Sequence, residues 1–411
     1  MYLSSMRAAD SARAGAVKHG LRRGRVPVTV VALGIVSFVT DASAEMITAV
    51  LPMYLIYGLG LGYLQLGALD SLYTGATALL RLAGGYAADR LNRPKAVAVA
   101  GYGVSALTRL GFPLAGGSLA GISTCVAIDR AGKGVRTAPR DAMITLATPT
   151  AELGRAFGVH RALDTAGALL GPLIAFGLLA LLPGGYDAVF MVSFCLGAIG
   201  VLVLIFFVRQ PGRAAARLPA LRAGLRVALQ PRVRSLVLAA GLLGLLTVGD
   251  MFLYVALQRQ AGLPTSMLPL LPLGTAGTFM LAAIPLGRFA DRFGRWRMFL
   301  AAHVLLAGAY LLVAGGIKGW VVAGAVLLLH GLFYAASDGV LMASAGPLVP
   351  EELRATGLAV VQTAQALARA VGALGFGIAT AAAAARPVFG VFAVLLVAGV
   401  FLAARMRGRR S

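Results

Sequence analysis

The sequence has few charged residues and almost no cysteine. Asp, Glu, Lys and Arg make up 13% of its 411 residues, whereas a soluble domain has about 25%. Both cysteines, Cys125 and Cys195, fall inside apolar segments, so we expect packing residues and no disulfide framework. Apolar runs of about 20 residues recur along the whole chain. These features exclude a secreted enzyme, a disulfide scaffold and a soluble nucleic-acid-binding protein.

The apolar runs predict an all-α polytopic membrane protein with twelve transmembrane helices. They lie at 28–57, 64–88, 95–116, 118–138, 155–182, 187–208, 235–258, 266–287, 296–316, 320–345, 355–384 and 387–405. The predicted domains are a basic tail, a six-helix half, a basic linker, a second six-helix half and a second basic tail, at 1–27, 28–208, 209–234, 235–405 and 406–411. Leucines at helical spacing between 217 and 229 favour an amphipathic surface helix, and a solvated linker is the alternative.

Positive charge lies mainly between the apolar segments. A formal net charge of +22 in a soluble protein would suggest nucleic-acid binding. Here Lys and Arg gather at alternate connections, which is the pattern of loops retained in the cytoplasm. We therefore expect a multi-pass protein of the inner (plasma) membrane with both termini cytoplasmic, and no nucleic-acid partner.

Two loops 202 residues apart share one pattern. The shared Gly, Asp and Arg positions are Gly85, Asp89, Arg90 and Arg93 in the first loop, and Gly287, Asp291, Arg292 and Arg295 in the second. The pattern G-x-x-x-D-R-x-G-R-x-R resembles the signature loop of the major facilitator superfamily, with Asn92 replacing a glycine in the first copy. The resemblance covers essentially the whole chain. It implies two six-helix halves around a central cavity, latched in one conformation by these loops.

The predicted fourth helix carries an unusual set of charges. They are Asp129, Arg130, Lys133, Arg136, Arg140 and Asp141. The segment Arg130-x-x-Lys133-Gly134 resembles the superfamily's helix-four motif, in which an arginine is linked to proton transfer, but Lys replaces the usual Gln. Four of the charges fall on one helical stripe, which must face a cavity or the other half because charge is costly in lipid. The stripe is expected either to attract an anionic substrate or to form an ion-pair lock between the halves, and Pro139 to end the helix.

The predicted first helix carries two carboxylates, Asp41 and Glu45, on one face. They are expected to bind protons, or to form salt bridges to the helix-four cations, and a switching salt bridge would satisfy both. A divalent metal site is the weakest alternative, because one helix supplies too few oxygen ligands. We expect no metal and no cofactor. Residues 37–46 and 129–142 also resemble a poorly characterised branch of bacterial and archaeal facilitators, which leaves the substrate open.

The predicted fifth helix contains Gly167, Gly171 and Pro172. This run resembles the superfamily's antiporter motif, with Ala175 and Phe176 replacing its two terminal glycines. Small residues let another helix approach closely, and Pro172 bends the helix. The resemblance implies export, and generic helix packing is the alternative.

Polar residues also interrupt the apolar helices of the second half. They are Asp250, then His330, Tyr334 and Asp338, then Gln362, Gln365 and Arg369. Such stripes in lipid mark substrate or proton routes, although His330 is better explained as a packing residue. Asp338 joins Asp41 and Glu45 as a proton-binding candidate. Asp70, Arg81, Arg109 and His303, which lie near helix ends or singly, are assigned no role.

Together these patterns predict a secondary transporter, most simply a proton-coupled exporter of a small molecule that works by alternating access. Uptake or exchange of an organic anion or phosphorylated solute is the alternative, and a non-transporting receptor or scaffold is the alternative from another class. No Walker-type loop or enzyme signature is present. The expected partners are the solute, protons and the lipid bilayer, and the chain is expected to act as a monomer.

Overall fold

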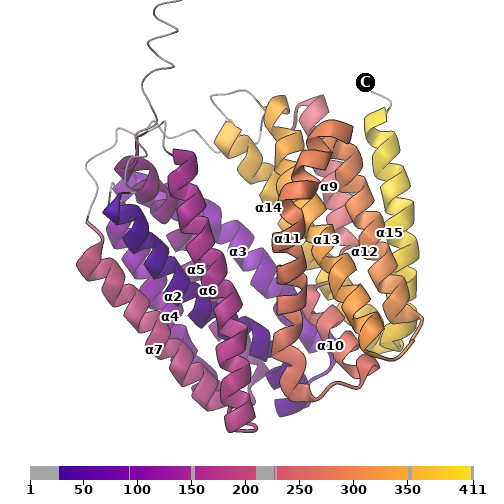
Figure 1. Cartoon of the computed structure of the whole chain (residues 1–411), viewed down its shortest axis with the longest axis horizontal. Helices are drawn as coiled ribbons and strands as arrows, with labels where there is room; N and C mark the ends of the chain where they lie inside the picture. The colour runs from indigo at the N-terminus through magenta and orange to yellow at the C-terminus, as the bar shows by residue number, and fades with distance from the viewer. Residues whose placement is uncertain are drawn as a thin grey trace, which may run out of the picture.

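The structure, a computed structural model, describes residues 27–91, 93–149, 153–209, 226, 229–349 and 354–408. Within these ranges the secondary structure consists of helices, and twelve spans of membrane length cross the molecule. Two six-helix halves lie side by side, the first drawn in indigo to pink and the second in salmon to yellow (Figure 1). The predicted all-α architecture is confirmed.

The N-terminal half contains the first six spans. They are α2 (Val28–Met53) with its π-helical extension η1 (Tyr54–Gly58), α3 (Tyr63–Leu91), α4 (Pro94–Ala115), α5 (Leu119–Ala147), α6 (Leu153–Leu181) and α7 (Tyr186–Phe207). Local signals set several starts. Pro94 occupies the first turn of α4, where its missing N–H leaves no hydrogen bond unmade, and Ser118 caps α5 by accepting from the Gly121 N–H.

The C-terminal half contains the other six spans. They are α9 (Pro231–Leu245) followed by α10 (Asp250–Ala261), η3 (Thr265–Leu270) followed by α11 (Leu271–Phe293), α12 (Arg295–Ala314), α13 (Trp320–Ala345) with η4 (Gly346–Leu348), α14 (Arg354–Ala382) and α15 (Ala385–Gly408). The turn between α11 and α12 requires Gly294, whose φ of 105° disfavours any side chain. This half begins and ends a few residues outside the predicted 235–405.

Ten helices in the described part of the chain are long and apolar enough to cross a membrane. The spans formed by α3 and α5 do not reach that threshold, because α5 carries the charged stripe and α3 is less apolar along its length. Both helices face the inside of the molecule, where α3 packs on α14 and α5 packs on α3 and α4. These two less apolar spans are thus packed against other helices of the protein.

We call the end of the molecule at which α7 ends and α9 begins the linker end, and the opposite end the far end; the linker end is at the top of Figure 1. At the far end the two halves are in contact. The Tyr57 hydroxyl donates to Gln258 Oε1 at 2.5 Å, and Arg259 donates to the hydroxyls of Tyr57 at 3.2 Å and Tyr63 at 3.3 Å. Nearby, Gly67 of α3 lies against the backbone of Ala373 in α14. The halves are thus closed against each other at the far end.

Two predicted helix boundaries are wrong. Pro139 does not end the fourth helix, since α5 continues to Ala147; a proline inside a helix removes one hydrogen bond but does not stop the chain from resuming. The seventh span is not one helix. It breaks over residues 246–249, where the backbone N–H of Val248 leaves the helical pattern and donates to the Tyr310 hydroxyl at 2.8 Å. The predicted amphipathic helix at 217–229 lies outside the described residues, apart from 226 and 229.

Candidate functional site

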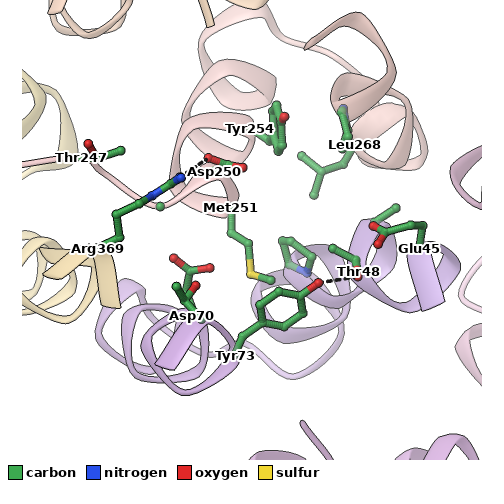
Figure 2. Close-up of a pocket in the computed structure, with 15 residues that line it drawn as sticks. Glu45, Thr48, Asp70, Tyr73, Thr247, Asp250, Met251, Tyr254, Leu268 and Arg369 are labelled. Carbon is green, nitrogen blue, oxygen red and sulfur yellow. Dashed lines mark hydrogen bonds and ion pairs between the residues drawn. The ribbon is translucent and has the colours of Figure 1, made fainter. Parts of the chain in front are cut away.

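A cavity of about 270 Å³ lies between the two halves. Helices α2 and α3 line it from the N-terminal half, and the break before α10, with η3, α11 and α14, lines it from the other half. Its polar lining consists of Glu45, Thr48, Asp70, Tyr73, Thr74, Thr247, Asp250, Tyr254 and Arg369 (Figure 2). We call this space the central cavity. It brings three carboxylates and one guanidinium together inside an otherwise apolar protein.

A second cavity of about 240 Å³ adjoins the central one and shares Tyr73 and Thr74 with it. Thr77 of α3 and Gln362 of α14 line it farther towards the linker end, together with Arg130 and Lys133 of α5. Both cavities therefore lie on the linker side of the far-end contact. Arg130 and Lys133 thus border the polar space on its linker side.

The two carboxylates of α2 have different surroundings. Asp41 Oδ1 lies 3.3 Å from the Arg136 guanidinium, and the two side chains are 10% and 4% exposed. Glu45 lies 3.5 Å from Lys133 Nζ, and this pair is 24% and 29% exposed. Glu45 lines the central cavity, whereas Asp41 lines neither cavity. The two carboxylates predicted as a pair therefore differ: Asp41 is in a buried ion pair, whereas Glu45 is in an ion pair that faces the cavity.

The antiporter-like run of α6 holds that helix against α2 at the level of these carboxylates. A Cβ atom on Gly167 would lie 2.1 Å from the Phe38 carbonyl oxygen, and one on Gly171 would lie 2.5 Å from that of Ala42. No real Cβ atom tolerates such distances, so only glycine fits at either position. The run therefore sets the position of α2, and with it the position of Glu45.

Asp129 is neutralised deep inside the N-terminal half. Arg130 binds it through Nε at 2.9 Å, Arg109 of α4 approaches to 3.4 Å, and Ser105 donates a hydrogen bond to it at 2.5 Å. The Arg130 guanidinium also stacks 4.0 Å from the ring centre of Tyr73, which lines the central cavity. Since the carboxylate, Arg109 and Arg130 are all buried, their mutual contacts offset the cost of removing the charges from water.

Arg140 joins α5 to α6 nearer the linker end. It lies 3.0 Å from Asp141 and 3.5 Å from Asp164, which also receives Arg161 at 3.5 Å. Arg161 and Asp164 of α6 therefore form an ion pair with each other. All ion pairs that we find among the described residues join groups of the same half, so the structure shows no ion-pair lock between halves in that part of the chain.

In the C-terminal half the polar residues converge on Asp250, the first residue of α10. The Tyr334 hydroxyl lies 2.7 and 2.8 Å from its two carboxylate oxygens, His330 Nε2 lies 3.4 Å away, and Arg369 lies 3.6 Å away. Arg369 also donates to the Tyr334 hydroxyl at 2.7 Å, and Thr275 holds the other ring nitrogen of His330 at 3.1 Å. We call Asp250, His330, Tyr334 and Arg369 the Asp250 cluster.

Of the duplicated loops, the structure describes the second copy more completely. Arg295 donates to Asp291 at 2.7 Å and to the carbonyl of Ala343 at 2.9 Å, so it ties the start of α12 to the end of α13. Asp291 thus accepts a hydrogen bond from the Arg295 side chain at the start of α12. Arg93 is exposed. The side chains of Gly85, Asp89 and Arg90 lie outside the described residues.

A family profile identifies the architecture independently. The profile of the Major Facilitator Superfamily matches residues 33–373, and it matches residues 276–411 again. The chain belongs to the major facilitator superfamily. It is a multi-pass membrane transporter of this type. An uncharacterized superfamily transporter of Methanocaldococcus jannaschii is 28% identical over 339 residues, covering 80% of this chain and 83% of the relative. An uncharacterized Mycobacterium tuberculosis protein is 32% identical over 203 residues, about half of each chain.

Solved structures of superfamily transporters share the fold. A variant of the nucleoside transporter NupG has a TM-score of 0.79 at 16% identity, covering 92% of this chain and 100% of that chain. A POT family transporter in complex with 5-aminolevulinic acid also scores 0.79, at 13% identity and over 93% and 96% of the two chains. A bacterial Spinster homologue, inward-facing and unoccupied, scores 0.72 at 17% identity over 93% and 97%. These likenesses show the fold of the superfamily.

The superfamily fold brings five of the predicted site residues to the cavities. Glu45, Asp250 and Arg369 line the central cavity, and Arg130 and Lys133 line the second one. His330 and Tyr334 reach the central cavity through Asp250. Gln365 lies on α14 but lines neither cavity, and the side chain of Asp338 lies outside the described residues.

Two residues without a predicted role belong to the site. Arg109 shares Asp129 with Arg130, and Asp70 lines the central cavity. Both residues could have been singled out from the sequence, because an ionisable residue within an apolar segment is energetically costly and usually functional. What the sequence did not provide was a partner, because Asp129 is distant from Arg109 in the chain and Asp70 faces the other half.

Proposed function

We propose that this transporter couples the outward movement of a small solute to the inward movement of protons. The observation that carries the proposal is the central cavity, in which carboxylates of both halves face one space while the far end is closed by Tyr57, Gln258 and Arg259. As the halves rock, such a carboxylate moves between contact with water and contact with a protein partner. Its proton affinity changes with these surroundings, so it can take up and release protons.

In the proposed cycle, the central cavity opens alternately at the linker end and the far end. The linker end is the cytoplasmic one if the alternation of basic loops sets the topology. Glu45 supports the proton role because it faces the cavity. Its ion pair with Lys133 is partly exposed, so the pair can open without leaving either charge buried and unpaired. The tight contact of Gly167 and Gly171 with α2 supports export, because this run resembles the antiporter motif.

The proposal is tested with purified protein in liposomes that contain a trapped pH indicator. A pH gradient is imposed, and solutes from a broad library are added one at a time. We expect at least one solute to dissipate the gradient only when the protein is present. We also expect Glu45→Gln to abolish this effect while the protein stays folded, as judged by its gel-filtration profile. Solute flux that is equal with and without a pH gradient would contradict proton coupling.

Transport of an organic anion is the second candidate, because Arg130 and Lys133 line the second cavity. Both cations are already bound to carboxylates, Arg130 to Asp129 and Lys133 to Glu45. An anion would have to displace an existing partner to bind there. In the same liposome assay, gradient dissipation by anions alone would favour this candidate.

A further inference from the structure

Asp70 is the carboxylate of the central cavity that stands without a partner among the described residues. It is 8% exposed and lines the cavity from α3, and it points into the space beside Tyr73 and below Arg369 (Figure 2). We find no hydrogen bond and no ion pair within 4 Å from its carboxylate in the described part of the chain. Glu45 and Asp250, in contrast, each have partners.

The surroundings of Asp70 do not neutralise it. Asp250 and Tyr254 of α10 face the same cavity, as does Glu45 of α2. The cations nearest the cavity are Arg369 of α14, which binds Asp250 and Tyr334, and Lys133 of α5, which binds Glu45. Arg130 of α5 is bound to Asp129, and His330 of α13 is directed at Asp250. The cations nearest the cavity are thus engaged with other groups, and none of them forms an ion pair with Asp70 in the described part of the chain.

Asp70 also lies against the break in the opposite half. A Cβ atom on Gly249 would be 1.8 Å from Asp70 Oδ2. The Asp70 carboxylate, from the N-terminal half, therefore lies directly beside the backbone that precedes α10 in the other half. Any group that binds Asp70 therefore changes the contact between this residue and the seventh span, which belongs to the other half. This contact connects the occupancy of Asp70 to the relative position of the halves.

We propose that a proton and the cationic group of the transported solute compete for the carboxylate of Asp70. The proposal deepens the proposed function and rests on it. A buried carboxylate without a partner is stabilised by either occupant, and it cannot bind both. When the cation binds, the proton leaves the carboxyl group for water, so each cation bound releases one proton and no other reactant is required.

The remaining lining of the central cavity indicates what kind of molecule carries the cationic group. Tyr73 and Tyr254 provide aromatic rings, while Met251, Leu268 and Pro272 provide apolar surface. Aromatic faces attract organic cations, and a cavity of about 270 Å³ is at the lower end of the range for small-molecule sites. The solute class is therefore a compact organic monocation with one ring or a short apolar body.

The test uses benzyltrimethylammonium, a permanent cation whose own charge does not change with pH, and benzenesulfonate as an anion of similar size. Binding to the purified transporter is measured by calorimetry at several pH values, and proton release is measured in weakly buffered solution. We expect the cation to bind more tightly than the anion, to bind more weakly as the pH falls, and to release a proton. We expect Asp70→Asn to weaken binding roughly tenfold or more, as loss of a charged partner does, and to abolish the release.

Asp187→Asn is the matched control, since it makes the same substitution at an exposed carboxylate at the start of α7. It should bind the cation and release the proton as the unmodified protein does. The proposal is overturned if Asp70→Asn is folded and behaves like this control, if the anion binds better than the cation, or if the unmodified protein binds no cation at millimolar concentration.

Failure of this proposal and failure of the proposed function give different results. If benzyltrimethylammonium does not bind but another solute still dissipates the pH gradient in liposomes, proton coupling stands and the role of Asp70 is wrong. If the cation binds Asp70 with proton release but no solute movement responds to the gradient, the site stands and proton-coupled transport is wrong.

Discussion

The two halves neutralise their buried charge in different ways. In the N-terminal half, ion pairs spread over several helices, so that α5 is tied to α2 through Asp41 and Arg136 and to α4 through Asp129 and Arg109. In the C-terminal half, the Asp250 cluster gathers its polar groups around one carboxylate beside a broken helix. The first arrangement stabilises a bundle, whereas the second places its polar centre at the cavity wall. We therefore expect the first half to move as a unit and the second to respond to what the cavity holds.

The largest expected effect comes from breaking the sealed pair of the N-terminal half. Arg136→Ala removes the ion-pair partner of the buried Asp41, and we expect it to lower the free energy of unfolding by about 3–5 kcal/mol. Lys133→Ala is the matched control, because its partner Glu45 faces the cavity; we expect a loss of about 1 kcal/mol or less. Reversible unfolding in mixed micelles measures both. Equal losses would mean that the two pairs are hydrated alike.

The next effect is centred on the Asp250 cluster. Tyr334→Phe removes the hydroxyl that contacts Asp250 and accepts from Arg369, and hydrogen bonds to charged groups are worth about 1.5–3 kcal/mol. We expect solute flux in liposomes to fall roughly tenfold or more. Tyr102→Phe is the control, since the hydroxyl of Tyr102 is buried without a hydrogen-bond partner in the described part of the chain. Unchanged flux in Tyr334→Phe would remove the cluster from the transport route.

A comparable or smaller effect, here a loss of stability, is expected from adding a methyl group at the contact between α6 and α2. A methyl group on Gly171 would lie 2.5 Å from a backbone oxygen, and overpacking of this kind costs about 1–3 kcal/mol. Gly177→Ala on the same helix has open space around the new methyl group, and its effect should stay within about 0.5 kcal/mol. Thermal unfolding of Gly171→Ala and Gly177→Ala in parallel checks this. If both variants melt together, the close approach of the two helices is not rigid.

The smallest effect concerns the contact that joins the halves at the far end. Arg259→Ala removes two exposed hydrogen bonds to Tyr57 and Tyr63, which shifts the conformational equilibrium by about 0.2–1 kcal/mol. In a cysteine-free background with Thr48→Cys in the central cavity, labelling from the far end should therefore speed up roughly 1.5- to 5-fold.

The control for the far-end contact is Arg386→Ala. Arg386 is exposed and packs beside Gly316 of its own half. Its removal should leave the labelling rate of Thr48→Cys unchanged. Faster labelling in both variants would point to a general effect of charge at this end and not to the contact between the halves.

Much of the fold could be predicted because lipid imposes a simple rule on sequence. Apolar length gave the twelve spans, and the tenth was placed at 320–345, where α13 is observed. The break in the seventh span was not predicted: residues 246–249 contain a glycine but no proline, and the Val248 N–H that leaves the helical pattern donates to Tyr310, some sixty residues away. Helix breaks that depend on a tertiary partner leave little trace in local sequence.

The candidate site was predictable to the extent that its members share a helix. Asp41 and Glu45, or His330 and Tyr334, show a common face through their spacing. Spacing could not reveal that Asp41 is sealed while Glu45 faces the cavity, since this depends on which neighbouring helix covers each turn. Asp70 is the clearest example, because the group it lies against, Gly249, belongs to the helix break before α10 in the other half.

The confinement of ion pairs to single halves, seen throughout the described residues, has a consequence for speed. Opposite charges pulled apart inside a low-dielectric protein resist separation over a long range. Hydrogen bonds such as those of Arg259 act over a short range and re-form with water once broken. In the proposed cycle, sliding one bundle past the other therefore breaks no ion pair in this part of the chain, and the barrier to the movement depends on short contacts such as those of Arg259.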